Sequence, residues 1–339
     1  MKTKQQRLIL AVSISIVIVF FPSCTGRAAT VTRELSEGRP LVIDTPSKVY
    51  FTADISPAGL MAAYNALEDT LINDSIAAGT VAVKVHTGES PNSNHLRPDF
   101  IKELVQLVNG TIVEANTAYG ESRASTAMHK QLAKDHGFTA IATVDILDEN
   151  GSISLPVRGG TRLRENLVGA NFTNYDYYVV LSHFKGHAMG GFGGAIKNIS
   201  IGIASSEGKM WIHTGGVSGT DVQRAFIRPD QDAFLDAMAE AGKSVADKLN
   251  GRILYINVMN RLSVACDCNA NPPEPDMHDI GILSSFDPVA LDQACVDLVY
   301  AAPDGASLIQ RMESKNGIRT IDHGAAIGLG SKTYELIRL

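Results

Sequence analysis

Residues 182–202 place side chains that could do chemistry among an unusual number of glycines. The stretch reads SHFKGHAMGGFGGAIKNISIG and follows an apolar run, YYVVL. Histidines can transfer protons or ligate a metal near neutral pH, lysines can hold a phosphate or carboxylate, and bare backbone can approach an anion. The candidate residues are His183, Lys185, His187, Gly190, Gly191, Gly193, Gly194, Lys197 and Asn198. The alternative is a tight connection whose glycines serve packing, but the concentration of polar side chains favours a site.

Two arginines in other segments could bind the anionic end of a ligand. Arg97 lies in HTGESPNSNHLRP (86–98), and Arg123 lies in EANTAYGESRAS (114–125). A guanidinium can clamp a carboxylate or phosphate with two hydrogen bonds. The alternative for Arg97 is that it simply precedes Pro98 at the start of a helix.

A third segment, CDCNANPPEPDMHD (266–279), offers soft ligands. The thiolates of Cys266 and Cys268 and the imidazole of His278 suit zinc, nickel or iron. Only Asp267 separates the two cysteines, so a disulfide between them would be strained. A metal site, a redox pair and plain surface thiols remain open, whereas Cys295 lies in an amphipathic helix and is most simply a core residue.

Strands alternate with helices along the chain, which predicts an α/β fold with mainly parallel sheets flanked by helices. We expect two lobes, about 48–204 and 205–339, with the Gly-rich loop at the strand exits between them. The expected strands are 48–54, 80–86, 111–116, 175–184, 252–259 and 279–286, and the expected helices are 56–76, 97–110, 122–137, 230–251 and 287–302.

These elements determine where the candidate residues should lie. Parallel strands end at one edge of a sheet, and ligands of α/β proteins bind outside that edge. Because each segment follows a predicted strand, His183, His187, Lys197, Arg97 and Arg123 should converge on one cleft. The glycine amides should face this cleft, Lys197 should lie in the first turn of a short helix, and the Cys266–Cys268 segment should lie at the rim.

The N-terminus predicts export. Of the 339 residues, the first seven, MKTKQQR, are basic and precede the apolar stretch LILAVSISIVIVFF, which is short for a membrane span. We expect a lipoprotein-type signal peptide over 1–23, lipidation of Cys24 and a tether over 24–47. The alternative is ordinary cleavage after Ala28 or Ala29. In either case the protein should lie in the bacterial cell envelope or periplasm. The net charge of −6 argues against nucleic-acid binding.

Several motifs resemble the domain-of-unknown-function 362 family. They include SHFKGH with GFGGAIKN, EANTAYGESR, CDC before DIGIL, and SSFDPVALDQACVDLV, so the resemblance covers about residues 48–304. Many members carry a ferredoxin-like insert whose cysteines bind two iron–sulfur clusters. At that place this chain has only VSGTDVQRAFIRP, without cysteine, so we expect no iron–sulfur cluster. The family name supplies no activity.

A second, more distant resemblance is to nickel-pincer lactate racemases. The spacing of His187, Lys197 and His213 resembles their pattern, which implies a proton shuttle at His187, a lysine-tethered cofactor at Lys197 and a metal ligand at His213. Ser122 stands before Arg123 where those racemases carry a second catalytic histidine. Because racemisation needs two acid/base groups, this departure bears on the reaction more than on the fold.

Two functions follow from these patterns. The first is an envelope enzyme, racemase- or isomerase-like or redox, that uses a divalent metal or a nickel-pincer-like cofactor on a small anionic substrate. The second is a non-catalytic lipoprotein that binds a small anion or metal ion between two lobes. In both, the membrane is contacted only through the lipid.

Overall fold

The computed structural model describes residues 33–34, 40–41 and 45–339 and divides the chain into two units after Thr45. In the first unit, β1 (Arg33–Glu34) pairs antiparallel with β2 (Pro40–Leu41). The predicted signal peptide, Cys24 and most of the tether lie outside the described residues. None of the described helices has the length and apolar character needed to cross a membrane.

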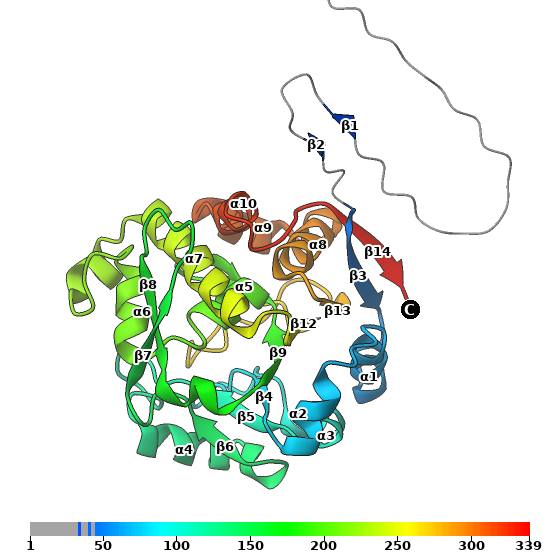
Figure 1. The fold of residues 1–339 in the computed structure, drawn as a ribbon, viewed down its shortest axis with the longest axis horizontal. Helices are drawn as coiled ribbons and strands as arrows, with labels where there is room; N and C mark the ends of the chain where they lie inside the picture. Colours follow the sequence, from blue (N-terminus) through cyan, green and yellow to red (C-terminus); the bar gives the residue numbers. More distant parts are fainter. Residues whose placement is uncertain (1–32, 35–39, 42–44) are drawn as a thin grey trace, which may run out of the picture. The chain divides into compact units, whose positions relative to one another are not determined.

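The second unit, Pro46–Leu339, is built on one eight-stranded sheet (Figure 1). In spatial order its strands are β14 (Tyr334–Arg338), β3 (Ser47–Thr52), β13 (Gly281–Ser285), β12 (Ile253–Met259), β9 (Tyr177–His183), β4 (Val81–Lys84), β5 (Thr111–Glu114) and β6 (Val144–Ile146). β13 runs antiparallel to both of its neighbours, and every other pair in this sheet is parallel. The carboxyl ends of β12, β9, β4 and β5 therefore lie side by side at one edge.

Helices cover both faces of this sheet, as the apolar strands require. On one face, Val179 and Leu181 of β9 pack in a core with Leu60, Ile101 and residues of neighbouring helices. On the other face, Tyr178 and Val180 share a core with helices that follow the Gly-rich segment. The first set is α1 (Pro57–Asn65), α2 (Ile72–Ala78), α3 (Pro98–Leu107) and α4 (Thr126–Asp135); the second is α5 (Ala195–Ser200), α7 (Gln231–Leu249), α8 (Pro288–Ala301), α9 (Ala306–Ser314) and α10 (Ile318–Ala326).

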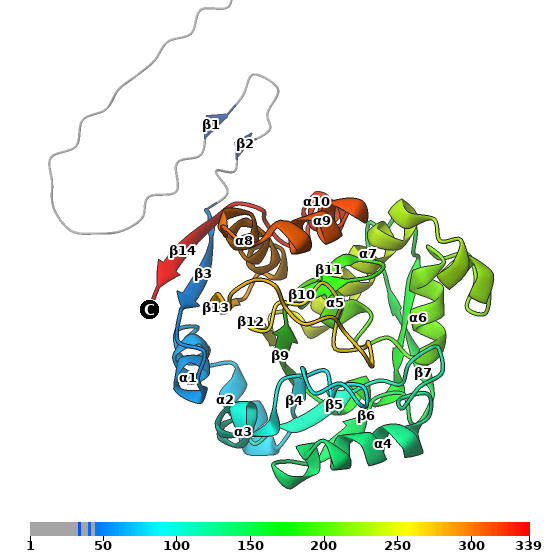
Figure 2. The same ribbon diagram turned by 180° about the vertical axis from the view of Figure 1, so that it is seen from behind.

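Two small hairpins and one further helix complete the unit. β7 (Ser152–Pro156) pairs antiparallel with β8 (Glu165–Gly169), and α6 (Ser206–His213) packs beside β8. The Gly-rich segment is itself a hairpin, β10 (Lys185–His187) with β11 (Gly191–Gly193), which leads into α5. Figure 2 shows this hairpin beside the irregular chain that joins β12 to β13. Short 3₁₀ turns at Phe138–Ala140 and Ala170–Asn174 and a π-helical turn at Gln223–Ile227 lie in connections.

The predicted fold class is confirmed, but the chain does not form two lobes with a sheet each. Strands from 48–204 and from 205–339 join the same sheet, because β12 pairs with β9 and β14 pairs with β3. The predicted helix 56–76 is two helices, α1 and α2, since Glu68 between them has φ of 46°, a left-handed conformation that a helix does not accommodate.

Candidate functional site

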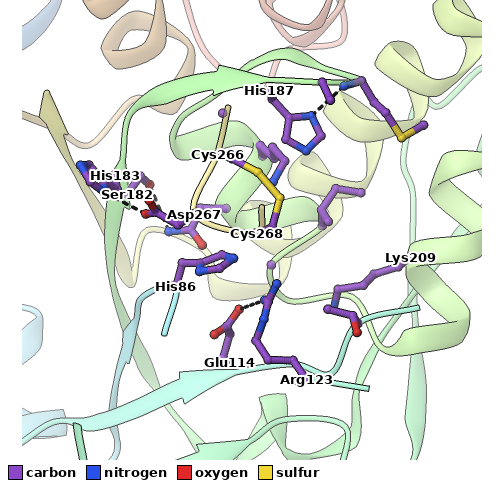
Figure 3. Close-up of a pocket in the computed structure, with 18 of the residues that line it drawn as sticks. His86, Glu114, Arg123, Ser182, His183, His187, Lys209, Cys266, Asp267 and Cys268 are labelled. Carbon is purple, nitrogen blue, oxygen red and sulfur yellow. Dashed lines mark hydrogen bonds and ion pairs between the residues drawn. A yellow bond between two sulfur atoms is a disulfide. The ribbon is translucent and has the colours of Figure 1, made fainter. Parts of the chain in front are cut away.

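A cavity of about 420 Å³ opens where β4, β5, β9 and β12 end (Figure 3). It is lined by four basic side chains, four imidazoles, two carboxylates and the two cysteines near β12. These residues are Lys84, Arg123, Lys197, Lys209, His86, His183, His187, His213, Glu114, Asp267, Cys266 and Cys268. The strand exits meet at this cavity, as the sequence predicts.

Most of the predicted site residues line this cavity, but not all. Those that do are His183, His187, Gly193, Gly194, Lys197, Asn198, Arg123, His213, Cys266 and Cys268. Lys185 is buried behind it, Gly190 lies in the turn of the hairpin, and Gly191 begins β11. Arg97 is exposed at the start of α3 and does not line the cavity, which contradicts its expected place. His278 is exposed and pairs with Asp304 at 2.8 Å, so it also lies outside the cavity wall.

Three lysines contribute positive charge that no carboxylate neutralises at close range. The Nζ of Lys84 donates to the Val85 carbonyl at 3.2 Å and to Asn198 Oδ1 at 3.0 Å, and that of Lys209 donates to the Ala204 carbonyl at 2.6 Å. Within residues 45–339, none of Lys84, Lys197 and Lys209 forms an ion pair. Burial lowers the pKa of Lys84 and of Lys197 to about 8 and the pKa of Lys209 to about 7.

Arg123, by contrast, is already paired. Its Nε lies 3.0 Å from Glu89 Oε2 and its Nη1 lies 3.0 Å from Glu114 Oε1. Glu114 also accepts from the Thr87 backbone N–H at 2.8 Å. Burial opposes the charge of Glu114, but the Arg123 guanidinium and the hydrogen bond to His129 hold the pKa of this carboxyl well below its usual range. The net charge of the cavity therefore comes from the lysines.

His86 and His187 face the cavity as neutral donors. The Nδ1 of His86 accepts the Gly88 backbone N–H at 2.9 Å, and the Nδ1 of His187 accepts that of Gly190 at 2.8 Å. An acceptor nitrogen carries no proton, so in each ring the proton is on Nε2. Burial holds the pKa of both rings well below the usual value. Each ring can therefore donate an N–H to an oxygen of a ligand, and neither has a free basic nitrogen.

The other two histidines have different bonds. The Nδ1 of His213 donates to the Lys209 carbonyl at 2.6 Å, which leaves its Nε2 with a lone pair. Burial lowers the pKa of His213 to about 4. His183 uses both nitrogens, with Nδ1 2.8 Å from Asp267 Oδ2 and Nε2 2.8 Å from the Asn260 carbonyl. His183 therefore has no free ring nitrogen for the catalytic role expected from the sequence.

Asp267 anchors the segment between β12 and β13. Its carboxylate accepts from His183 and from Lys185, whose Nζ lies 2.8 Å from Oδ1, and all three side chains are buried. Burial alone would raise the pKa of Asp267, but His183 and Lys185 hold it well below its usual range. Lys185 is thus a structural partner of Asp267 rather than a ligand-binding residue.

A disulfide joins Cys266 to Cys268, with an S–S distance of 2.03 Å. The sequence had argued against this bridge, because only one residue separates the two cysteines. The donor atoms of His187, Cys266 and Cys268 lie within 4.8 Å of one another. A bridged sulfur is not the thiolate that metals bind. In addition, a metal-bound imidazole normally donates its other N–H, whereas the second nitrogen of His187 accepts. In its bridged form the cysteine pair therefore offers no thiolate ligands to a metal.

The N-terminus of α5 is closed by a carboxylate. Asp292 accepts the backbone N–H groups of Ala195 at 2.8 Å and Ile196 at 3.0 Å. A Cβ on Gly194 would lie 2.2 Å from Asp292 Oδ1, so this glycine permits the close approach. Asp292 therefore occupies the amides of Ala195 and Ile196 at the start of α5, and Lys197 lies in the first turn of this helix, as predicted.

Residues missed by the sequence analysis are Lys84, His86 and Lys209. Lys84 interrupts the apolar run VAVKV and is 1% exposed, and a buried lysine without a carboxylate partner indicates a site. His86 directly follows that strand. Lys209 lies in α6 and carries no comparable signal in the sequence.

Comparison with known proteins gives the family. The model described as "Domain of unknown function (DUF362)" matches residues 81–297, so the chain belongs to this family, as the motifs predict. No curated protein matches the sequence.

Two solved structures are similar to this chain. One is the lactate racemase apoprotein from Thermoanaerobacterium thermosaccharolyticum, with 15% identity, 80% of this chain and 62% of that chain covered, and a TM-score of 0.42. The other is a protein from Thermotoga maritima, with 9% identity, 75% and 59% covered, and a TM-score of 0.35. The chain thus spans about three fifths of each. At these TM-scores the likenesses support no conclusion about function.

Proposed function

We propose that the protein is an enzyme that binds a small carboxylate in this cavity and removes a proton from a carbon next to a carbonyl group of that substrate. The observation that carries this proposal is a set of three cavity lysines, the buried Lys84 and Lys209 and the half-buried Lys197, which have no carboxylate partner within residues 45–339. Burying an ammonium group is unfavourable unless an anion compensates it. An anionic substrate supplies that compensation.

We assign one of the three cavity lysines to catalysis and the other two to binding of the substrate carboxylate. Lys209 has the lowest pKa of the three, about 7, so a large fraction of it is an uncharged amine at neutral pH and can act as the base. Lys84 and Lys197, with pKa values of about 8, remain mostly charged and hold the carboxylate. This assignment makes Lys197 an anion anchor.

His86 and His187 act as hydrogen-bond donors in this scheme. When a proton leaves a carbon next to a carbonyl, negative charge develops on the carbonyl oxygen. A neutral imidazole whose Nε2–H points at that oxygen stabilises the charge without giving up its proton. Figure 3 shows both rings directed into the cavity, together with Arg123 and Lys209. His187 is therefore proposed as a donor, in place of the proton shuttle implied by the racemase resemblance.

A lysine-tethered metal cofactor is compatible with two of these residues. Lys197 and His213 line the same cavity, and His213 presents the unprotonated Nε2 that a metal requires. When bound, such a group would supply an electrophile, with Lys197 as its tether and His213 as its ligand. Lys84 would still bind the substrate carboxylate.

Deuterium exchange tests the proposed chemistry. The protein is incubated in D₂O with small oxo- and hydroxycarboxylates, and the signal of the proton next to the carbonyl is followed by NMR. We expect that signal to disappear with at least one compound, that Lys209→Met stops the exchange but preserves binding, and that exposed Lys102→Met changes neither. Binding of carboxylates without exchange in any compound would contradict the enzyme and favour the non-catalytic binding protein.

We also propose that the chain is exported and anchored by a lipid on Cys24, on the basis of its basic and apolar N-terminus. Metabolic labelling with a fatty acid should label the wild type and not Cys24→Ser. A mature chain that begins after Ala28 or Ala29 would contradict the anchor. Iron and sulfide analysis tests the expected lack of a cluster, and two clusters per chain would overturn it.

A further inference from the structure

The Cys266–Cys268 disulfide has a place in the cavity that packing does not explain. Both cysteines line the cavity wall and are partly exposed, whereas Cys295 is buried in the core as a free thiol. We propose that this disulfide is redox-active and exchanges electrons with small thiols that carry a carboxylate. This is an activity beyond proton abstraction, and it uses the same basic cavity for a different group.

The surrounding loop does not need the bridge to keep its position. Asp267, between the two cysteines, is held by His183 and Lys185. The Asn92 side chain donates to the Asn269 carbonyl at 2.9 Å, and the Gly186 backbone N–H donates to the Ser263 carbonyl at 2.9 Å. A bridge between residues two apart also restricts the unfolded chain less than one that closes a long loop. Reduction should therefore leave the fold intact.

The cavity favours the reduced form chemically. A thiolate leaves a disulfide faster when nearby positive charge lowers its pKa. Lys197 and Lys84 line the same cavity, and a nitrogen of the His187 ring lies within 4.8 Å of the sulfur atoms. Because the Nε2 of His187 carries a proton, it can donate a hydrogen bond to the thiolate that forms. The same lysines that would hold a substrate carboxylate would hold the carboxylate of an incoming thiol.

The exchange proceeds in two balanced steps. The thiolate of one incoming molecule attacks the Sγ of one cysteine, the Cys266–Cys268 bond breaks, and the other cysteine leaves as a thiolate that takes up a proton. A second incoming thiolate attacks the mixed disulfide, which releases the oxidised small molecule and the second cysteine thiolate, again protonated. Two small thiols lose two electrons and become a disulfide, and Cys266 and Cys268 gain those electrons and two protons.

Thiol trapping on the folded protein tests this proposal. The oxidised protein is treated with mercaptoacetate or with uncharged 2-mercaptoethanol at equal thiolate concentration, and free thiols at Cys266 and Cys268 are alkylated and mapped by mass spectrometry. We expect both cysteines to be reduced, about tenfold or more faster with mercaptoacetate, because the cavity charge attracts the carboxylate. Circular dichroism and the thermal midpoint should change little on reduction.

Matched variants locate the effect. Cys268→Ser leaves Cys266 as a free thiol, which should attack the disulfide form of mercaptoacetate, form one mixed disulfide on Cys266 and release one mercaptoacetate thiolate. Lys197→Met should remove most of the preference of the wild-type disulfide for mercaptoacetate, and Lys102→Met should keep it. Equal rates with the two thiols, or reduction only after unfolding in urea, would overturn the proposal. The readout requires no turnover of a carboxylate substrate, so a failure of the proposed proton abstraction would be seen separately.

Discussion

Replacing Lys197 by methionine should stabilise the protein at neutral pH, although it removes a residue proposed to bind the ligand. Methionine has a similar length and keeps the apolar contacts of the lysine stem. Burial lowers the pKa of Lys197 from the ordinary 10.5 to about 8. A difference of that size between the folded and unfolded states corresponds to about 3 kcal/mol of lost stability when the amine is charged in both states.

The effect should depend on pH in a defined direction. Below pH 8 the amine is charged in both states, so the folded wild type bears the full penalty. Between pH 8 and 10.5 the folded state releases its proton first, and the stability of the wild type rises relative to Lys197→Met. Urea unfolding of both proteins at pH 7 and pH 10 measures this, and the advantage of the variant, about 3 kcal/mol at pH 7, should shrink at pH 10.

Lys185→Met is the matched control. Lys185 is more deeply buried than the half-buried Lys197, and its ammonium pairs with Asp267 at 2.8 Å. Removing it leaves Asp267 with the His183 ring as its remaining side-chain partner, so this variant should lose about 3–5 kcal/mol at pH 7. If Lys197→Met also lowers stability at pH 7, or if its effect does not vary with pH, then Lys197 is compensated in the folded protein and the reasoning about the cavity is refuted.

Two further predictions concern packing and the Asp267 cluster. Gly194→Ala should lower the urea midpoint strongly, because its Cβ would lie 2.2 Å from the Asp292 carboxylate. The control Gly193→Ala places its Cβ 3.1 Å from the flexible Lys197 side chain and should be nearly as stable as the wild type. Equal losses of stability in the two variants would refute the account of the α5 cap. Asp267→Asn should lower the free energy of unfolding in urea by about 3–5 kcal/mol at pH 7 and by much less near pH 2. The Asp267 carboxylate stabilises the fold fully above its unfolded pKa near 4, and this stabilisation is lost as the pH falls toward its lower folded pKa. A loss that stays constant with pH would contradict the ion-pair explanation.

Local sequence patterns predicted much of the fold. Asp287 before Pro288 predicts a helix start, and its carboxylate accepts the N–H groups of Val289 and Ala290. The apolar run before His183 predicts a strand buried on both faces, and β9 is that strand. The reversed direction of β13 was not predictable, because the residues of a buried strand do not encode which way it runs.

The sequence predicted where the site lies in the fold but not what its side chains do there. Topology brings the strand exits together, so the positions of His187, Lys197 and Arg123 followed from the order of elements. Their roles depend on partners far away in sequence. Asp267 occupies His183 from 84 positions along the chain, and Asp292 closes the α5 amides from 97 positions. Such contacts are set by tertiary packing, and a single sequence does not show them.

The central claim is that uncompensated lysines bind a small carboxylate in this cavity. Calorimetric titration of the protein with small carboxylates at pH 6.5 and pH 9.5 tests it most directly. The account predicts that affinity falls by about tenfold or more at pH 9.5, as Lys84, Lys197 and Lys209 lose their charge. It also predicts that Lys197→Met weakens binding at pH 6.5 while Lys102→Met does not. Equal affinity at both pH values, or undiminished binding when all three cavity lysines are replaced by methionine, would contradict it.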